Sequence, residues 1–253
     1  MATELLTSSL LPVPHGFATR AGGVSEGAFA SLNLGFSTGD ERARVEENLR
    51  RFAAAAGAPL GALCRVSQVH GDRVLEARAE EGSDGLRPTE GEADGLWTQA
   101  PGTWVAVGTA DCVPVLLVDP DGQRVAAVHS GWRGTDAEIS VRAVELLVAR
   151  GARPERLLAA VGPAIQRCCY EVSDELGQRF AARFGDEVVS RDAARPHLDL
   201  SRAVRLSLVR AGLKAGHVDV LQACTACEPG RFFSHRRDAG RTGRHLSYVL
   251  HRF

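Results

Sequence analysis

Three side chains that can bind a metal ion or serve in nucleophilic catalysis lie at the ends of predicted strands. His70 ends one apolar run, Cys112 precedes a second and His129 ends a third. One thiolate and two imidazoles leave the fourth position of a tetrahedral zinc ion open, which is typical of catalytic zinc sites, whereas structural sites have four protein ligands. We therefore predict that His70, Cys112 and His129 are both metal ligands and catalytic residues, with zinc as the cofactor.

A predicted β-hairpin would bring Cys112 and His129 together. Residues 119–122 have the sequence Asp-Pro-Asp-Gly, which is typical of a tight turn between two strands. If Pro120 and Asp121 form the loop, Cys112 lies directly opposite His129, with the two Cβ atoms about 4.5–5.5 Å apart. A one-residue bulge after the turn would change this register.

A helix is predicted after the second strand of this hairpin. Thr135 and Glu138 have the spacing of a capping box, and the helix should continue to about Arg150. Arg133 and the free backbone N–H groups at the helix start would lie beside the Cys/His pair, which suits an anion such as phosphate. The simpler alternative is a buried strand before an ordinary helix, with Cys112 as a small core residue.

Four further residues are predicted to bind the substrate together with Arg133. Arg20 and Asn33 lie in Gly-rich segments that resemble binding loops, although plain surface turns explain them equally well. Arg236 belongs to a group of four arginines around a Gly-rich loop, which suits phosphate or a carboxylate; a solvated basic loop is the alternative. Asp111, next to Cys112, could orient a ligand histidine or accept a substrate hydroxyl.

The composition excludes several classes of partner. With 44% apolar and 24% charged residues, the 253-residue chain is typical of a globular protein with a sizeable core. The net charge of −1 and the lack of a polybasic run argue against nucleic acid as a partner. No apolar run approaches the roughly 18 residues of a membrane span, and the N-terminus has no basic signal-peptide region. We therefore expect a cytoplasmic protein with small-molecule partners and no membrane association.

The six cysteines are expected to be reduced thiols, since no secretion signal is present. Adjacent cysteines rarely bind one ion or bridge each other, so Cys168 and Cys169 are predicted to be one core thiol and one loop thiol. Cys224 and Cys227 form a C-x-x-C pair, which is a weak signal here. A zinc knuckle needs a second pair, and a thioredoxin-like motif should begin a helix, which residues 228–230 do not suggest.

The remaining pattern predicts one domain of strands and helices over residues 1–253, since no repeat or linker is evident. The polar, Gly-rich residues 80–95 are predicted to form a loop. Helices are predicted at 41–56, at 201–211, and from a Ser173 cap to about 184. Strands are predicted at 16–20, 63–69, 73–79, 156–165, 197–200, 217–221 and 245–252.

Taken together, these segments resemble the YfiH family, also described as laccase-domain or polyphenol oxidase-like proteins. The resemblance extends from about Gly16 to Arg244, and its combination of motifs is highly specific. One small departure is Ser130, where the family commonly has alanine. The motifs that carry the resemblance are residues 68–71, 110–117, 127–134, 162–165, 168–172 and 233–238.

The resemblance implies an α+β fold of packed mixed β-sheets flanked by helices in a single compact domain, with a more distant likeness to Cys/His toxin deamidases. It also implies a zinc site at His70, Cys112 and His129. Family members are described as phosphorylases of adenosine, inosine and methylthioadenosine that also deaminate adenosine. Older descriptions name a copper-dependent oxidase of polyphenols, and copper could replace zinc at such a soft site.

The residue content argues against some of these functions. A multicopper oxidase needs many histidine ligands, but this chain has eight histidines, no His-x-His pair and one methionine. The zinc signature of cytidine deaminases is also missing. A Cys/His hydrolase with Cys112 as nucleophile and His129 as base would leave His70 without a role. The resemblance therefore leads us to expect a zinc-dependent purine nucleoside phosphorylase with adenosine deaminase activity, with the hydrolase and the copper-dependent polyphenol oxidase as alternatives.

Overall fold

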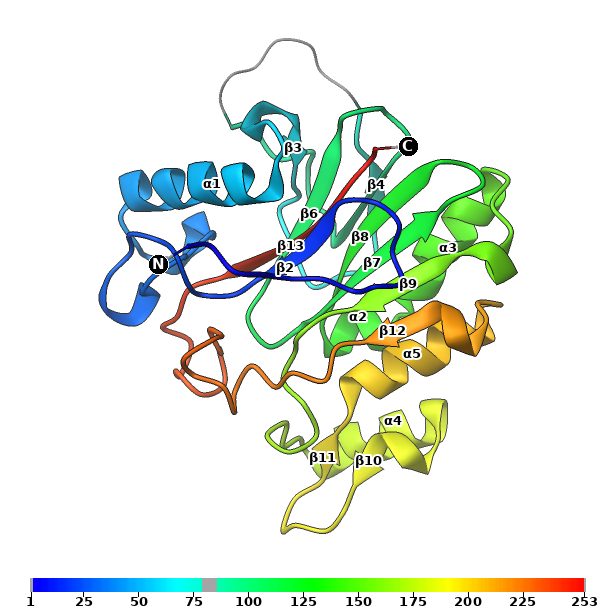
Figure 1. Cartoon of the computed structure of the whole chain (residues 1–253). Coiled ribbons are helices and arrows are strands. Elements are labelled where there is room, and N and C mark those ends of the chain that lie inside the picture. Colours follow the sequence, from blue (N-terminus) through cyan, green and yellow to red (C-terminus); the bar gives the residue numbers. More distant parts are fainter. Residues whose placement is uncertain (1, 79–85, 253) are drawn as a thin grey trace.

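Two β-sheets lie against each other in the protein, and helices cover their outer faces (Figure 1). The computed structural model describes residues 2–78 and 86–252. The strands of the larger sheet are β4 (Val74–Glu76), β5 (Gly95–Thr98), β7 (Val113–Asp119), β8 (Arg124–Ser130), β9 (Leu158–Val161) and β12 (Val218–Val220). Their order is β12-β9-β7-β8-β5-β4, and the sheet is mixed because β9–β12 and β4–β5 are parallel pairs.

The second sheet has five strands and carries the chain ends. Its strands are β1 (Leu5–Leu6), β2 (His15–Ala18), β3 (Leu63–Cys64), β6 (Trp104–Thr109) and β13 (His245–Leu250). They lie in the order β1-β2-β13-β6-β3, and only β3 pairs with its neighbour in the parallel direction. A separate two-stranded sheet consists of β10 (Val189–Ser190) and β11 (His197–Leu198).

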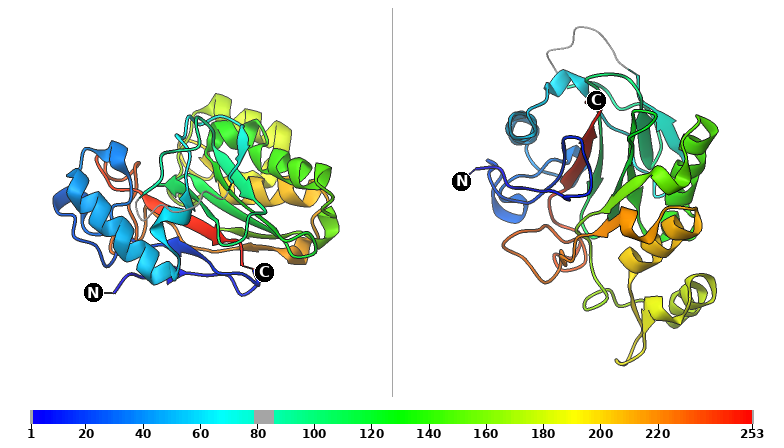
Figure 2. Two further views of the ribbon diagram at one scale, coloured as in Figure 1. Left: turned by 90° about the horizontal axis from the view of Figure 1, so that it is seen from above. Right: turned by 45° about the vertical axis from the view of Figure 1, so that its right-hand side comes forward.

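The helices lie on opposite sides of the paired sheets (Figure 2). The α-helices are α1 (Arg42–Ala56), α2 (Trp132–Asp136), α3 (Ile139–Ala149), α4 (Asp174–Phe184) and α5 (Leu200–Arg210). Short 3₁₀ helices are η1 (Gly27–Phe29), η2 (Phe36–Thr38), η3 (Leu60–Ala62), η4 (Pro154–Arg156), η5 (Asp186–Val188) and η6 (Ala215–His217). Within the described residues, no helix combines the length and apolarity that a membrane crossing requires.

Three apolar clusters fill the spaces between these layers. One lies between the two sheets and includes Phe17, Val107 and Leu116. A second packs α1 on the five-stranded sheet, where the rings of Phe52 and Trp104 stack with centroids 5.6 Å apart. The third joins α3, α4 and α5 to the larger sheet. The predicted fold class, an α+β arrangement of packed mixed sheets flanked by helices, is therefore confirmed.

Most predicted helices and strands are present, but the strands are shorter than predicted. The predicted cap is confirmed at Ser173, whose hydroxyl accepts a hydrogen bond from the Leu176 amide at 3.2 Å. In the predicted strand 63–69, Leu63 and Cys64 pair with β6, and Ser67 forms an isolated parallel bridge with Glu92 as the chain continues toward His70. Of the predicted loop 80–95, residues 80–85 lie outside the described part of the chain, and 86–94 form no helix or regular strand.

The β7–β8 hairpin has a different register from the prediction. Its connection has four residues instead of two, because the Asp119 carboxylate closes it by accepting hydrogen bonds from the Gly122 amide (3.1 Å) and from Arg124 Nη1 (2.6 Å). Asp119 therefore pairs with Arg124, and Pro114 pairs with His129. The predicted pairing was wrong by two residues. A shift of two residues keeps every side chain on its predicted face of the sheet, so the core pattern is unchanged.

The helix after β8 begins earlier than predicted and is interrupted. α2 begins at Trp132, and Glu138 adopts a left-handed conformation (φ 59°) immediately before α3 begins at Ile139. Thr135 lies inside α2, where its hydroxyl is hydrogen-bonded to the buried Ser130 hydroxyl at 2.8 Å. The predicted capping box of Thr135 and Glu138 is therefore wrong, because the threonine has a different partner.

A buried histidine at the start of β13 should make the stability of the protein depend on pH. His245 Nε2 accepts a hydrogen bond from the Phe233 amide (2.8 Å), which requires an unprotonated nitrogen. Burial lowers the pKa of His245 from 6.5 to about 4, and the charges of Arg20 and Arg244 act in the same direction. Between these two pH values the unfolded chain binds a proton that the folded chain does not bind.

We therefore expect the free energy of unfolding to fall as the pH drops from about 6.5 toward 4, by on the order of 3 kcal/mol in total. Urea unfolding between pH 7.5 and 4.5 measures this loss. His245→Asn should flatten the pH dependence, whereas the control His197→Asn should retain it. An equal slope in the wild type and in His245→Asn would contradict the assignment.

Candidate active site

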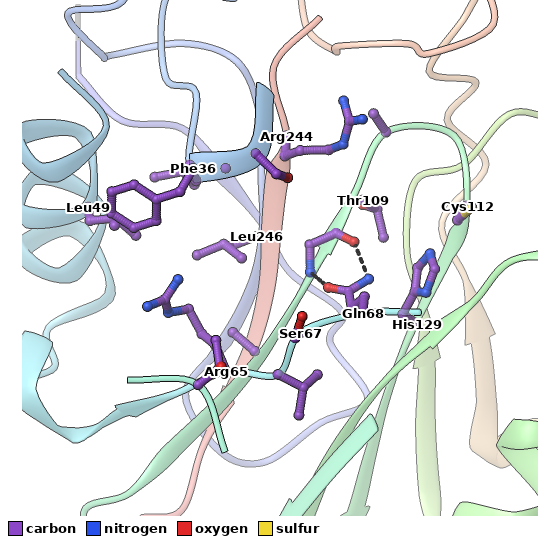
Figure 3. Close-up of a pocket in the computed structure, with 18 of the residues that line it drawn as sticks. Phe36, Leu49, Arg65, Ser67, Gln68, Thr109, Cys112, His129, Arg244 and Leu246 are labelled. Atoms are coloured by element: carbon purple, nitrogen blue, oxygen red, sulfur yellow. Dashed lines mark hydrogen bonds between the residues drawn. The ribbon is translucent and has the colours of Figure 1, made fainter. Parts of the chain in front are cut away.

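A cleft of about 1550 Å³ lies beside the strand ends that carry the predicted catalytic residues. This volume exceeds the range of about 300–1,000 Å³ that is usual for small-molecule sites, so the cleft has room for more than one bound group. Figure 3 shows Cys112 and His129 on one side of the cleft and Phe36 and Leu49 on the other. The cleft therefore has reactive groups on one side and, on the other, apolar side chains together with charged residues of α1.

His70, Cys112 and His129 gather at one point of this cleft. Their potential ligand atoms all lie within 4.8 Å of one another. The two imidazole rings are nearly perpendicular, with centroids 4.8 Å apart. His129 is buried, Cys112 is partly buried and His70 is exposed, so a bound ion would be reached from the side of His70. The structure thus brings together the three residues that the sequence placed at separate strand ends.

The observed hairpin register explains how the Cys112 thiol reaches the two histidines. Cys112 directly precedes β7 and Gly131 directly follows β8, so the two residues face each other across the end of the hairpin. A Cβ atom at Gly131 would lie 3.1 Å from Cys112 Sγ and 3.4 Å from His70 Cδ2. The missing side chain at Gly131 therefore leaves the space in which the three groups meet.

Asp94, which the sequence analysis did not select, holds two of these residues in place. Its fully buried carboxylate lies 2.8 Å from His129 Nδ1 and accepts hydrogen bonds from the amides of Val69 (3.2 Å), His70 (2.9 Å) and Gly71 (2.6 Å). An ionised carboxylate can only accept, so Nδ1 of His129 carries a proton, and Nε2 is the nitrogen that can bind a cation once it has lost its own proton. One carboxylate therefore orients one histidine and the backbone of the other.

The chain segment that carries His70 is fixed from two sides. We call residues 65–71 the His70 arm. Gln68 forms two hydrogen bonds with the backbone of Gly108 on β6, at 2.6 and 2.8 Å (Figure 3). His70 itself has a left-handed backbone (φ 59°), which is unfavourable for a residue with a side chain. The three hydrogen bonds from backbone amides to the Asp94 carboxylate stabilise this conformation and so fix the imidazole at the cleft.

The charges of the site favour the reactive form of the thiol. Burial opposes ionisation of Cys112, but the neighbouring His129 and His70 lower its pKa to about 6. Burial likewise opposes protonation of His129, but the Cys112 thiolate and Asp94 raise the pKa of His129 to about 9. Cys112 is thus a thiolate at neutral pH, which is the form that binds metal ions and the form that attacks as a nucleophile.

Two of the predicted substrate-binding residues line the same cleft. Asp111 has φ 89°, and its carboxylate accepts hydrogen bonds from the Thr225 hydroxyl (2.6 Å) and the Arg236 amide (2.7 Å). The Arg236 guanidinium lies over the Tyr170 ring at 5.2 Å and donates to the Glu171 carbonyl. The Asp111 carboxylate thus ties the Arg236 loop to the segment that carries the reactive thiol.

A second guanidinium in the cleft belongs to Arg244, which the sequence analysis noted only as one of four loop arginines. Its Nη1 donates to the carbonyls of Thr242 and Gly243, and its side chain extends into the cleft (Figure 3). Burial lowers the pKa of Arg244, whereas the negative charges of Cys112 and Asp111 raise it. Among the described residues, no carboxylate forms an ion pair with Arg236 or Arg244. Of the arginines that line the cleft, these two lie near Cys112 and Asp111, and their guanidinium groups suit an anionic ligand.

Arg20 and Asn33 do not line the cleft and have partners elsewhere. The Arg20 guanidinium donates to the carbonyls of Ala30 (2.6 Å) and Pro229 (2.8 Å). Asn33 is buried, and its Oδ1 accepts the Arg244 amide at 2.9 Å. Asn33 therefore supports the loop that carries a cleft arginine, whereas Arg20 joins two surface loops.

Arg133 also lies outside the lining of the cleft. Its exposed guanidinium is 4.8 Å from the centroid of the Trp132 ring, and Trp132 is the residue of this segment that faces the cleft. The early start of α2 accounts for the difference, because it makes position 133 part of the first helical turn instead of a loop before the helix. Asp94, Gln68 and Arg244 take part in the site although residue type and spacing alone did not single them out.

Comparisons with known proteins cover almost the whole chain. Residues 14–252 match the family described as multi-copper polyphenol oxidoreductase laccase. A purine nucleoside phosphorylase from Deinococcus radiodurans is 46% identical over 241 residues, which cover 95% of this chain and 90% of that protein. An adenosine deaminase from an unknown prokaryotic organism is 38% identical over 239 residues, which cover 89% of this chain and 90% of that protein.

A solved structure gives the same result for the fold. The crystal structure of the hypothetical protein YfiH from Bacillus licheniformis superposes with a TM-score of 0.90 at 33% sequence identity. The match covers 98% of this chain and 96% of that chain. The similarity therefore extends over the two sheets, the helices and the loops that form the cleft.

Proposed function

Because this chain belongs to the YfiH family of laccase-domain proteins, we propose that it is a zinc-dependent purine nucleoside phosphorylase that also deaminates adenosine. The proposed substrates are adenosine, inosine and methylthioadenosine, each with phosphate, and the products are the free base and the ribose 1-phosphate. Residues 1–253 form one catalytic domain. The observation that carries the proposal is the close group of His70, Cys112 and His129 beside the guanidinium groups of Arg236 and Arg244, which have no carboxylate partner in the described part of the chain.

The three side chains suit a zinc ion. A thiolate and two imidazoles are preferred zinc ligands, and three of them leave a position for the substrate. Asp94 supplies the outer hydrogen bond to His129 Nδ1 that is usual for a metal-binding histidine. His70, Cys112 and His129 would hold the ion, which would supply a Lewis acid able to polarise a bound oxygen.

The residues around this group would bind and orient the substrates. In phosphorolysis, a phosphate oxygen forms a bond to C1′ of the ribose while the bond from C1′ to the purine nitrogen breaks. Arg236 and Arg244 would hold the phosphate for this attack through charge-assisted hydrogen bonds. Burial raises the pKa of Tyr170 to about 12, so its hydroxyl keeps its proton and can donate to a substrate oxygen.

Removing Arg244, one of the two cleft arginines near Cys112, should weaken phosphate binding selectively. We expect Arg244→Ala to raise the Michaelis constant for phosphate by about ten- to a hundredfold, because one hydrogen bond between charged groups contributes about 1.5–3 kcal/mol. The Michaelis constant for inosine should change much less. Initial rates at varied phosphate concentration give both constants.

Two further variants make this measurement decisive. Arg241 is exposed in the same loop and does not line the cleft, so Arg241→Ala is the matched control and should behave like the wild type. Arg133→Ala tests the phosphate role predicted for Arg133 from the sequence. If Arg133→Ala raised the constant for phosphate and Arg244→Ala did not, the phosphate would bind at the α2 segment instead.

A second candidate function is supported by one specific arrangement. Asp94, His129 and Cys112 form a hydrogen-bonded carboxylate, imidazole and thiolate series like that of Cys/His hydrolases. In such an enzyme Cys112 would form a covalent intermediate, and metal would not be required. This alternative gives no role to His70, which is why we rank it second.

Copper could replace zinc at the same ligands, as the family description implies. A multicopper oxidase, however, needs several copper sites with many histidines. Among residues 2–78 and 86–252, two groups of side chains lie close enough together to hold an ion, and only the His70 group contains histidine. We therefore propose that any copper bound here occupies the single site proposed for zinc.

The experiment that tests the proposed function combines an assay with metal removal. Purified protein is incubated with inosine and phosphate, and ribose 1-phosphate is measured before chelation, after chelation and after zinc is added back. We expect product formation to stop on chelation and to return with zinc. Activity that resists chelation, together with rapid alkylation of Cys112 and no ribose 1-phosphate, would favour the hydrolase.

A further inference from the structure

Four cysteines that the proposed reaction does not use lie together outside the cleft. Cys168 and Cys169 belong to the loop after β9, and Cys224 and Cys227 belong to the loop after β12. Their four sulfur atoms all lie within 4.8 Å of one another. All four are free thiols, and none of them lines the cleft.

The topology of the larger sheet brings the two loops together. β9 and β12 are parallel neighbours, so both loops leave the same end of the sheet. The pairing continues beyond the strands, where the Ala164 amide donates to the Ala223 carbonyl (3.3 Å) and the Thr225 amide donates to the Ala164 carbonyl (3.1 Å). This extension fixes Cys224 against the chain that leads to Cys168.

Two predictions from the sequence are corrected by this arrangement. Cys168 is exposed and Cys169 is partly exposed, both in the loop, so neither is the core thiol that was expected. The C-x-x-C pair of Cys224 and Cys227 was considered weak because it had no second pair. The second pair is Cys168 with Cys169, which only the parallel pairing of β9 and β12 brings close.

We infer that Cys168, Cys169, Cys224 and Cys227 form a structural binding site for one zinc ion. Four thiolates fill all positions of a tetrahedral zinc ion, which is typical of structural sites and leaves no position for a substrate. The site is therefore chemically distinct from the group with one thiolate and two imidazoles in the cleft. It does not depend on the proposed catalytic function.

The sulfur positions are close to those that zinc requires. With Zn–S bonds of about 2.3 Å, tetrahedral geometry places the sulfur atoms about 3.8 Å apart. Cys227 Sγ lies 3.4 Å from Cys168 Sγ and 3.3 Å from Cys169 Sγ, so these two distances would need to increase only slightly, and all the sulfur atoms lie within 4.8 Å of one another. The Gln166 amide also donates to Cys224 Sγ at 3.5 Å, which favours the thiolate that zinc binds.

A disulfide explains the same arrangement less well. A disulfide joins two sulfur atoms at about 2.05 Å and would leave the other two thiols as unexplained neighbours. Cys227 lies equally close to Cys168 and Cys169, so the geometry selects neither partner. A tetrahedral ion uses all four sulfur atoms at once.

The ion would fasten a loop that lines the cleft to a second loop that supports a lining residue. Ile165 and Tyr170, on either side of the first cysteine pair, line the cleft. Thr225, between the second pair, donates to the Asp111 carboxylate at 2.6 Å, and its carbonyl accepts from Arg237 Nη1 at 2.8 Å. The structural zinc would thus hold the loop positions on which the substrate-binding residues depend.

Metal analysis of the full-length protein, purified in reductant with zinc, tests this inference. The Cys112→Ala variant lacks the thiolate of the cleft, and we expect it to retain one zinc ion per chain. Cys227→Ala should lose that ion, and Cys64→Ala, which removes a buried thiol that belongs to neither group of ligands, should match the wild type. After exchange with cobalt(II), Cys112→Ala should give the intense visible absorption of a tetrahedral tetrathiolate site, and the variant with both Cys112→Ala and Cys227→Ala should not.

The outcomes separate this site from the proposed catalytic function. If Cys112→Ala bound no zinc and gave no tetrathiolate spectrum, the inference would be overturned whatever the wild-type activity. A mass lower by two hydrogens, with a Cys168–Cys227 or Cys169–Cys227 peptide, would show a disulfide and also overturn it. If circular dichroism shows that Cys227→Ala does not fold, Cys168→Ser takes its place. The cobalt(II) absorption spectrum of Cys112→Ala then still decides whether the tetrathiolate site exists.

Discussion

Replacing Cys112 with alanine should abolish nucleoside phosphorolysis and remove the zinc ion of the cleft. The thiolate is the only charged ligand of the proposed site, and the two imidazoles left behind would bind zinc weakly. A Lewis acid contributes several kcal/mol to stabilisation of the transition state, so we expect kcat to fall by about 10³-fold or more. Zinc per chain and the rate of ribose 1-phosphate formation are measured on the same preparation.

The control for this variant is Cys64→Ala, which removes one buried thiol from the apolar cluster between the sheets. It should retain its metal and its activity. The two candidate functions differ in the metal content of Cys112→Ala. An inactive variant that kept both the cleft zinc and the wild-type fold would speak for Cys112 as a nucleophile instead of a ligand.

Asp94→Asn should be the second most damaging change, although Asp94 does not itself reach the cleft. One side-chain oxygen accepts from His129 Nδ1 and the His70 amide, and the other accepts from the amides of Val69 and Gly71. An asparagine presents an NH₂ group to one of these sets of donors. We expect zinc affinity and activity to fall by about 10–100-fold.

The same substitution should also lower the free energy of unfolding by about 1–3 kcal/mol, because buried amides lose their acceptor. Competition with a chelator measures the zinc affinity, and urea unfolding measures the stability. Asp72→Asn is the matched control, since Asp72 lies beside the His70 arm but is exposed and pairs with Arg142. Wild-type zinc affinity in Asp94→Asn would show that the histidines are positioned without the carboxylate.

The three residues of the centre could be predicted because their types and positions are local features of the sequence. Cys112 and His129 do lie at adjacent ends of β7 and β8, as their apolar runs predicted, whereas His70 lies six residues beyond the end of β3, on the His70 arm. The register that joins Cys112 to His129 could not be predicted in the same way. This register depends on the Asp119 side chain, whose hydrogen bonds with Gly122 and Arg124 lengthen the turn.

The features that were missed depend on pairings between distant segments. Asp94 precedes β5, and nothing in the sequence indicates that β5 pairs with the strand of His129. The four-cysteine group likewise depends on the parallel pairing of β9 with β12. Arg20 and Asn33 show the opposite case, in which polar residues of Gly-rich loops resemble binding residues in the sequence but contact other loops in the structure. Local patterns therefore predicted the reactive groups better than the residues that support them.

The bonds between Asp94 and three consecutive amides have a consequence for the motion of the His70 arm. A carboxylate that moved away would release Val69, His70 and Gly71 together, and the left-handed backbone of His70 would lose its support at the same moment. The arm is thus expected to open as one cooperative unit, with a single equilibrium between a docked and a released state. In the released state only Cys112 and His129 remain in position, so the population of the docked state would scale the affinity of the site for a metal ion.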